Sequence, residues 1–123
     1  MPEVAGEEVR LTMPATPQLL RVARLTAAGL AGRLGFSFDE IEDVKIAVDE
    51  LCFALVGSKG RGGTLTVTYR LADEQLEIIG EGDFAADGPT VAPSDLSAQI
   101  LAAVVDEHEV SPARFRLLKR RAH

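Results

Sequence analysis

The chain has few of the residues and segments that form disulfide bonds, anchor a protein in a membrane or make up common catalytic sets. Its 123 residues include a single cysteine, Cys52, which excludes an internal disulfide bond. No apolar run approaches the ~20 residues that a membrane-spanning helix needs, and the acidic start of the sequence has no apolar signal segment. We therefore expect a cytoplasmic protein without a membrane partner. The sequence also lacks a Ser-His-Asp set and a Cys-x-x-Cys pattern, so no common enzyme class is supported.

Positive charge is in the minority. Thirteen Lys and Arg residues stand against nineteen Asp and Glu residues, a net charge of -6. Nucleic-acid binding depends on cations that neutralise phosphates, so this balance argues against a broad nucleic-acid surface. Five bases nevertheless gather near the C-terminal end: Arg114, Arg116, Lys119, Arg120 and Arg121. We interpret them as the exposed face of a terminal strand and keep a basic-tailed nucleic-acid binder as an alternative.

What is present is the composition of one globular domain. Hydrophobic residues make up 46% of the chain and charged residues 26%, and a domain of this length buries roughly two thirds of its unfolded surface. We expect a flexible N-terminus over residues 1–8 and a single domain over residues 9–121. Cys52 lies in an apolar periodic run, which indicates a small buried hydrophobe rather than a reactive thiol.

The first half of the chain predicts a strand and two helices. Residues 9–13 alternate apolar and polar side chains, which predicts a half-buried strand ended by Pro14. Thr16 and Pro17 have the form of an N-cap and a first helical residue, and Gly35 that of a C-cap. The apolar stripe of this first helix is predicted at Leu19, Val22, Ala23, Leu30 and Leu34. A second helix should begin with a Ser37–Glu40 capping box and bury Ile41, Val44, Val48, Leu51 and Leu55.

The second half predicts four strands and a third helix. Residues 57–63 are too rich in glycine for regular structure, and strands at 64–71 and 75–79 follow around a short turn. The pattern breaks over residues 80–93, a helix is expected at 96–105, and two strands at 107–110 and 113–120 close the chain. This order predicts the α+β class: a two-layer α/β sandwich with a mixed, mostly antiparallel sheet and helices on one face.

The same order of elements resembles the GHKL, or Bergerat, ATPase fold of histidine kinases and gyrase-type topoisomerases. Local sequences resemble the anti-sigma factors of that fold that are also serine-protein kinases. Residues 22–26 resemble the Ala-Arg motif of that family's first helix, and residues 41–50 resemble the run into its N box. Residues 76–79 resemble the strand before its G1 box, and residues 105–107 and 114–119 resemble its ending.

The resemblance implies an ATP site, and this chain departs from it in each of three boxes. In the N box, Glu50 stands at the position of the general base, but Ala54 replaces the asparagine that holds magnesium. In the G1 box, Asp83 matches the adenine-binding carboxylate only after a one-residue slip. In the G2 box, residues 95–97 (Asp-Leu-Ser) replace Gly-x-Gly, and Asp95 would cap the helix and repel phosphate. We therefore expect no cofactor, with ATP and magnesium bound only if the site still functions.

The predicted function is that of an anti-sigma-factor-like regulator without catalysis, a pseudokinase. The resemblance implies that Arg24, with Arg21 beside it, binds a sigma factor or its antagonist, and that the protein is a homodimer. The alternative role for Arg24 is a plain surface arginine. Two other functions stay open: an active serine-protein kinase with Glu50 as base, and the basic-tailed nucleic-acid binder. We expect Glu50 to be solvated or to face a partner, and the Asp39, Asp43 and Glu50 stripe to be solvated rather than a metal site.

Overall fold

The structure is a computed structural model that describes residues 6–84 and 94–122. Of the predicted flexible N-terminus, residues 1–5 lie outside the described residues, and the first strand already begins at Glu7. In chain order the elements are β1 (Glu7–Pro14), the 3-10 turn η1 (Pro17–Leu19), α1 (Leu20–Arg33), α2 (Phe38–Val56), β2 (Gly63–Ala72), β3 (Gln75–Phe84), α3 (Asp95–Val104), β4 (Glu107–Ser111) and β5 (Arg114–Arg120).

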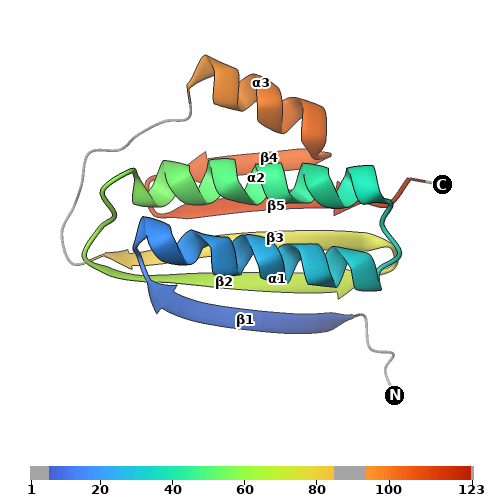
Figure 1. Cartoon of the computed structure of the whole chain (residues 1–123), viewed down its shortest axis with the longest axis horizontal. Coiled ribbons are helices and arrows are strands. Elements are labelled where there is room, and N and C mark those ends of the chain that lie inside the picture. The colour runs from blue at the N-terminus through green and yellow to red at the C-terminus, as the bar shows by residue number, and fades with distance from the viewer. Residues whose placement is uncertain (1–5, 85–93, 123) are drawn as a thin grey trace.

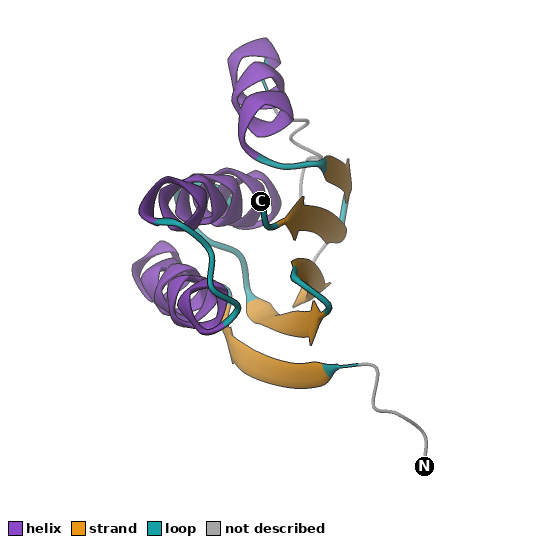
Figure 2. Ribbon diagram, turned by 90° about the vertical axis from the view of Figure 1, so that its right-hand side faces the viewer, coloured by secondary structure: helices purple, strands orange, loops and turns teal. Residues whose placement is uncertain are grey.

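The five strands form one antiparallel sheet in the order β1-β2-β3-β5-β4. The helices cover one face of this sheet, with α1 beside α2 and α3 standing at the far end near β4, as Figure 1 and Figure 2 show. Within residues 6–84 and 94–122, the other face carries no helix. The predicted two-layer α+β sandwich is therefore confirmed, and the sheet is antiparallel throughout.

The core lies between α1, α2 and the sheet. On α2, seven residues are buried: Val44, Ala47, Val48, Leu51, Cys52, Leu55 and Val56. On the sheet side, the fully buried Tyr69 of β2 donates a hydrogen bond from its hydroxyl to the carbonyl oxygen of Ala23, 2.8 Å away. This bond satisfies the one polar group of a large buried ring and ties the sheet to α1.

The first helix differs from the prediction in its start and its buried face. Thr16 stands at the N-cap, but its side chain makes no capping hydrogen bond, and the chain enters α1 through the 3-10 turn. The buried stripe contains Leu20, Ala23, Ala27 and Ala31. Val22, predicted for the core, is 42% exposed. Small alanines face inward because α1 packs closely against its neighbours, which leaves the larger Val22 to point outward.

Strand β3 runs five residues beyond its predicted end at Ile79. Gly80 and Glu81 pair with β2 on one side and with β5 on the other, and β2 pairing continues to Phe84. Two neighbouring strands supply hydrogen bonds for a glycine-containing segment whose own strand propensity is low. The predicted break therefore begins later than expected. The rest of it, residues 85–93, lies outside the described residues.

Two turn signals are confirmed. Gly35 has φ of +82° immediately after α1, as the predicted C-cap glycine requires. The β2–β3 turn places Asp73 and Glu74 at positive φ, 39° and 66°, the conformation that suits the right-handed twist of a tight hairpin.

In the described part of the chain, no helix combines the length and hydropathy needed to cross a bilayer.

Candidate functional site

Helix α2 carries the predicted N box residues. Glu50 and Ala54 are one helical turn apart, on the side of α2 that faces α3. The hydroxyl of Ser97 donates a hydrogen bond to Oε1 of Glu50 at 2.5 Å. Glu50, which we expected to be solvated or to face a partner, is half-buried, and this hydrogen bond joins its carboxylate to α3. Ala54 has only a methyl group at the position where a magnesium ligand would be required.

The G1 stretch is part of the sheet. Gly80 is buried in β3, where a Cβ atom would lie 2.2 Å from Cε2 of Phe115. Asp83 is exposed near the end of β3 and pairs with Thr64 of β2. The glycine is therefore explained by packing against a buried ring. The predicted adenine carboxylate lies on a regular strand rather than on a loop that wraps a base.

The G2 stretch begins α3. Ser94 is the N-cap, because its Oγ accepts a hydrogen bond from the backbone N–H of Ser97 at 3.1 Å. The prediction that Asp95 caps this helix is wrong, since Asp95 is the first helical residue. Its exposed carboxylate still lies in the turn where a phosphate would need positive potential. Neither Ala54 nor Asp95 has the chemical group that the resemblance implies for holding magnesium or phosphate at its position.

The acidic stripe of α2 does not form a metal site. Among residues 6–84 and 94–122, no group of three or more His, Cys, Asp and Glu side chains is arranged to hold a metal ion. Asp43 instead pairs with Lys119 of β5 at 3.4 Å. Cys52 is fully buried, and this burial raises the pKa of its thiol to about 12, which keeps the thiol neutral and unreactive.

The predicted partner-binding arginines lie beside a shallow hollow between the start of α1 and the end of α2. The hollow has a volume of about 280 Å³ and is lined by Pro17, Leu20, Arg21, Arg24, Asp49 and Phe53. Nη1 of Arg24 lies 3.0 Å from Oδ2 of Asp49, in an ion pair whose two side chains are both partly exposed. Among the described residues, Arg21 makes no ion pair.

Exposed apolar side chains occur on the same two helices, and one of them, Phe53, lines this hollow. Four large apolar residues on the outward faces of α1 and α2 are between 42% and 57% exposed: Val22, Leu25, Ile46 and Phe53. We name these four, with Arg21, Arg24 and Asp49, the helix-face surface. An exposed apolar cluster with two arginines has the composition of a protein-binding surface. Phe53 and Asp49 were missed from sequence, because helical spacing alone does not show which residues of α1 and α2 become neighbours.

The distribution of acidic residues along the sequence could have indicated where this surface lies. No Asp or Glu occurs between residues 9 and 38 or between residues 51 and 72, although the chain is acidic overall. The fold brings these two acid-free segments together, with the backbone N–H of Arg61 bonded to the carbonyl oxygen of Ala15 at 2.9 Å. These two segments therefore contribute the bases Arg21, Arg24 and Lys59 but no carboxylate, while α2 adds Asp49, which pairs with Arg24.

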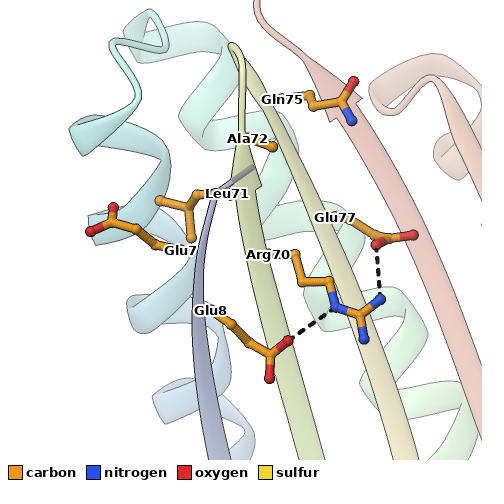
Figure 3. A pocket seen from close by; sticks show the side chains of 8 residues that line it. Glu7, Glu8, Arg70, Leu71, Ala72, Gln75 and Glu77 are labelled. Atoms are coloured by element: carbon orange, nitrogen blue, oxygen red, sulfur yellow. Dashed lines mark hydrogen bonds and ion pairs between the residues drawn. The ribbon is translucent and has the colours of Figure 1, made fainter. Parts of the chain in front are cut away.

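The basic C-terminal cluster is neutralised within the chain. Its acidic partners are Glu81 for Arg114, Glu77 and Glu107 for Arg116, Asp43 for Lys119, Glu107 for Arg120 and Glu74 for Arg121. The helix-free face of the sheet continues this pattern, as Figure 3 shows for Arg70 between Glu8 and Glu77. That group lines a second hollow of about 250 Å³. Its cation is already paired with two carboxylates, so we see no anion site there.

The chain is similar to proteins named serine-protein kinase RsbW. It is 42% identical over 74 residues to RsbW of Halalkalibacterium halodurans, a match covering 59% of this chain and 46% of the relative. It is 34% identical over 101 residues to RsbW of Bacillus cereus strain G9842, which covers 76% and 63% respectively. RsbW of Bacillus subtilis is 36% identical over 83 residues, 63% of this chain and 52% of the relative.

These matches cover between 46% and 63% of the length of the three relatives. No protein-family model matches the chain. The similarity is thus to part of the length of proteins that are named for kinase activity.

Proposed function

We propose that this protein is an anti-sigma-factor-like regulator that binds a sigma factor, or a related regulatory protein, without hydrolysing ATP. The helix-face surface carries the proposal. It joins four exposed apolar residues to two arginines, of which Arg24 pairs with Asp49 and Arg21 makes no ion pair among the described residues. Arginine can form bidentate bonds to carboxylates, and apolar surface supplies most of the free energy of association. A partner with acidic and apolar side chains therefore suits this surface.

The similarity to RsbW proteins supports a role in partner switching, which is the process that the sequence resemblance implies. The altered boxes support a regulator that works by binding alone. Ala54 offers no magnesium ligand, Asp95 brings negative charge to the phosphate end, and Glu50 is engaged by Ser97. We place Arg24 at the centre of the partner contact, with Arg21 beside it.

Binding to a panel of purified bacterial sigma factors, followed by calorimetry, tests this proposal. We expect at least one micromolar complex, and we expect Arg24→Glu to weaken it by tenfold or more because a partner carboxylate would then meet a like charge. Arg33→Glu is the matched control. Arg33 lies on the same helix but pairs with Glu7, away from the helix-face surface. Equal losses in both variants, or no complex with any sigma factor, would overturn the proposal.

The second candidate is an active serine-protein kinase, which the names of the relatives and the retained Glu50 favour. Calorimetric titration with magnesium ATP separates the two. A ligand at 100 times its dissociation constant should stabilise the protein by about 2.7 kcal/mol, so thermal shift provides a second readout. The regulator proposal expects no binding at millimolar ATP. Micromolar binding would instead favour the kinase and make Glu50→Gln the next variant.

The proposal extends to a homodimer, as the sequence resemblance implies. Light scattering at micromolar concentration tests it, because one chain has a mass of 13.1 kDa and a dimer twice that. The nucleic-acid alternative has little support, since all five C-terminal bases already pair with acidic side chains. Strongly salt-dependent binding to DNA or RNA would revive it.

A further inference from the structure

Helix α3 is attached to the rest of the molecule very differently at its two ends. The C-terminal end is anchored in the core through the fully buried Leu101 and the buried Val105. Nζ of Lys119 also donates a hydrogen bond to the carbonyl oxygen of Val104 at 2.7 Å. This end of α3 therefore needs no further support.

The N-terminal end of α3 has no such anchor. Asp95, Leu96, Ala98 and Gln99 are all exposed, and only Ser97 in this part of the helix is half-buried. Ser97 stands one turn before Leu101, so it continues the inward stripe of α3 with a hydroxyl in place of an apolar side chain. Among the described residues, its bond to Glu50 is the one side-chain hydrogen bond that joins this half of α3 to α2.

The geometry aims the Ser97 hydroxyl at Glu50. Its oxygen accepts a hydrogen bond from the Ser94 hydroxyl at 3.2 Å, and its proton is donated to Oε1 of Glu50 at 2.5 Å. A hydroxyl has one proton to donate, and Ser97 donates it to this carboxylate. Hydrogen bonds to an ionised acceptor are shorter and about twice as strong as neutral ones. The Ser94 bond adds to the polarisation of the Ser97 hydroxyl.

We propose that the Ser97 hydroxyl occupies the Glu50 carboxylate where a ligand would otherwise bind. We further propose that this single hydrogen bond holds the N-terminal half of α3 closed against α2. Glu50 then stabilises the closed position of α3 instead of serving a bound ligand. This inference concerns α2 and α3 and does not depend on which protein binds the helix-face surface.

Hydrogen exchange of the backbone amides, followed by mass spectrometry, tests the proposal in the full chain. In Ser97→Ala the amides of residues 97–101 should exchange roughly ten- to a hundredfold faster, the factor expected for losing a hydrogen bond to a charged group. Peptides from the centre of α2 should be unchanged. Alanine is a better helix former than serine, so helix propensity alone predicts slower exchange in this variant. Loss of the hydrogen bond therefore predicts faster exchange in Ser97→Ala, whereas helix propensity alone predicts slower exchange.

Gln99→Ala is the matched control, because Gln99 is exposed on the same helix and a change to alanine alters propensity alone. Glu50→Ala should speed α3 exchange as Ser97→Ala does, and the double variant should add nothing further. Unchanged or slower exchange in Ser97→Ala, or additive effects in the double variant, would overturn the proposal. So would protection of α3 in the wild-type chain by millimolar magnesium ATP, because Glu50 would then be open to a ligand.

Discussion

At the scale of single residues, the ring of Phe115 leaves no room for a side chain at Gly80. A Cβ atom on Gly80 would lie 2.2 Å from Cε2 and 2.6 Å from Cζ of Phe115, and that ring is fully buried. Buried rings cannot move aside without opening space elsewhere in a close-packed core. The glycine thus has a packing role that requires no nucleotide.

Gly80→Ala should lower the free energy of unfolding by about 1–3 kcal/mol, the usual cost of overpacking a core. Urea denaturation followed by circular dichroism measures it. Gly29→Ala is the control: in the middle of α1, no atom beyond its chain neighbours and the helix's own backbone lies within 4 Å of the added Cβ. That variant should raise stability by up to about 1 kcal/mol, because alanine favours the helix. Loss of stability in the control alone would contradict this account.

At the scale of elements, α2 is the central helix, since it contacts α1, α3 and β5. Its start is defined by a reciprocal capping box. Oγ of Ser37 accepts a hydrogen bond from the backbone N–H of Glu40 at 3.1 Å, and Oε1 of Glu40 accepts one from the backbone N–H of Ser37 at 2.7 Å. Two backbone donors that the helix itself cannot satisfy are thereby paired.

Removing one side of this box should weaken the whole domain, because α2 contacts both other α-helices. Ser37→Ala is expected to lower the free energy of unfolding by about 1 kcal/mol, the typical value for loss of an N-cap. Chemical denaturation measures this value. Ser58→Ala, in the exposed turn after α2, should change stability by less than about 0.5 kcal/mol. A Ser37→Ala protein as stable as the Ser58→Ala protein would show that the box contributes nothing.

At the scale of the whole molecule, ion pairs connect distant parts of the chain. Arg116 of β5 lies 2.6 Å from Glu77 of β3 and 3.1 Å from Glu107 of β4. The hydrogen bond from Arg116 lowers the pKa of Glu107. Backbone hydrogen bonds, first from Ser37 and then from Ala122, lower the pKa of Glu40. Both carboxylates therefore favour the folded state in their ionised form.

Acid should destabilise the protein as a consequence. A carboxylate whose pKa is lower in the folded state stabilises it above the unfolded pKa, and that contribution is lost as the pH falls through the folded pKa. We expect the thermal unfolding midpoint to fall as the pH is lowered through and below about 4.5, the ordinary pKa of a glutamate. Glu40→Gln keeps a residue that can complete the capping box but removes the charge, so its midpoint should fall less.

Asp73→Asn is the control for this measurement. Asp73 is exposed in the β2–β3 turn and, within the described part of the chain, makes no ion pair. Its removal should leave the acid-induced fall unchanged. If Glu40→Gln and Asp73→Asn respond to acid in the same way as the wild-type chain, then native contacts of Glu40 do not cause the acid sensitivity.

Signals that act within a few residues predicted the local structure well. The alternation before Pro14, the capping box at Ser37 and Glu40, and the positive φ at Gly35 all appear in the structure. Each depends on hydrogen bonds or steric limits inside one turn or one strand, so the type and order of elements follow from the sequence. The order of these elements in turn predicted the two-layer sandwich.

Contacts between distant segments were decided by the tertiary structure alone. The extension of β3 to Phe84 requires strands on both sides, and the exposure of Val22 follows from how closely α1 packs. The pairing of Arg24 with Asp49 and of Ser97 with Glu50 joins residues 25 and 47 positions apart. Periodicity shows which side of a helix is apolar, but it does not show which helix lies beside it. The sequence determined the elements, and the packing of α1 and α3 on α2 decided the chemistry between them, because those contacts depend on the positions of whole helices.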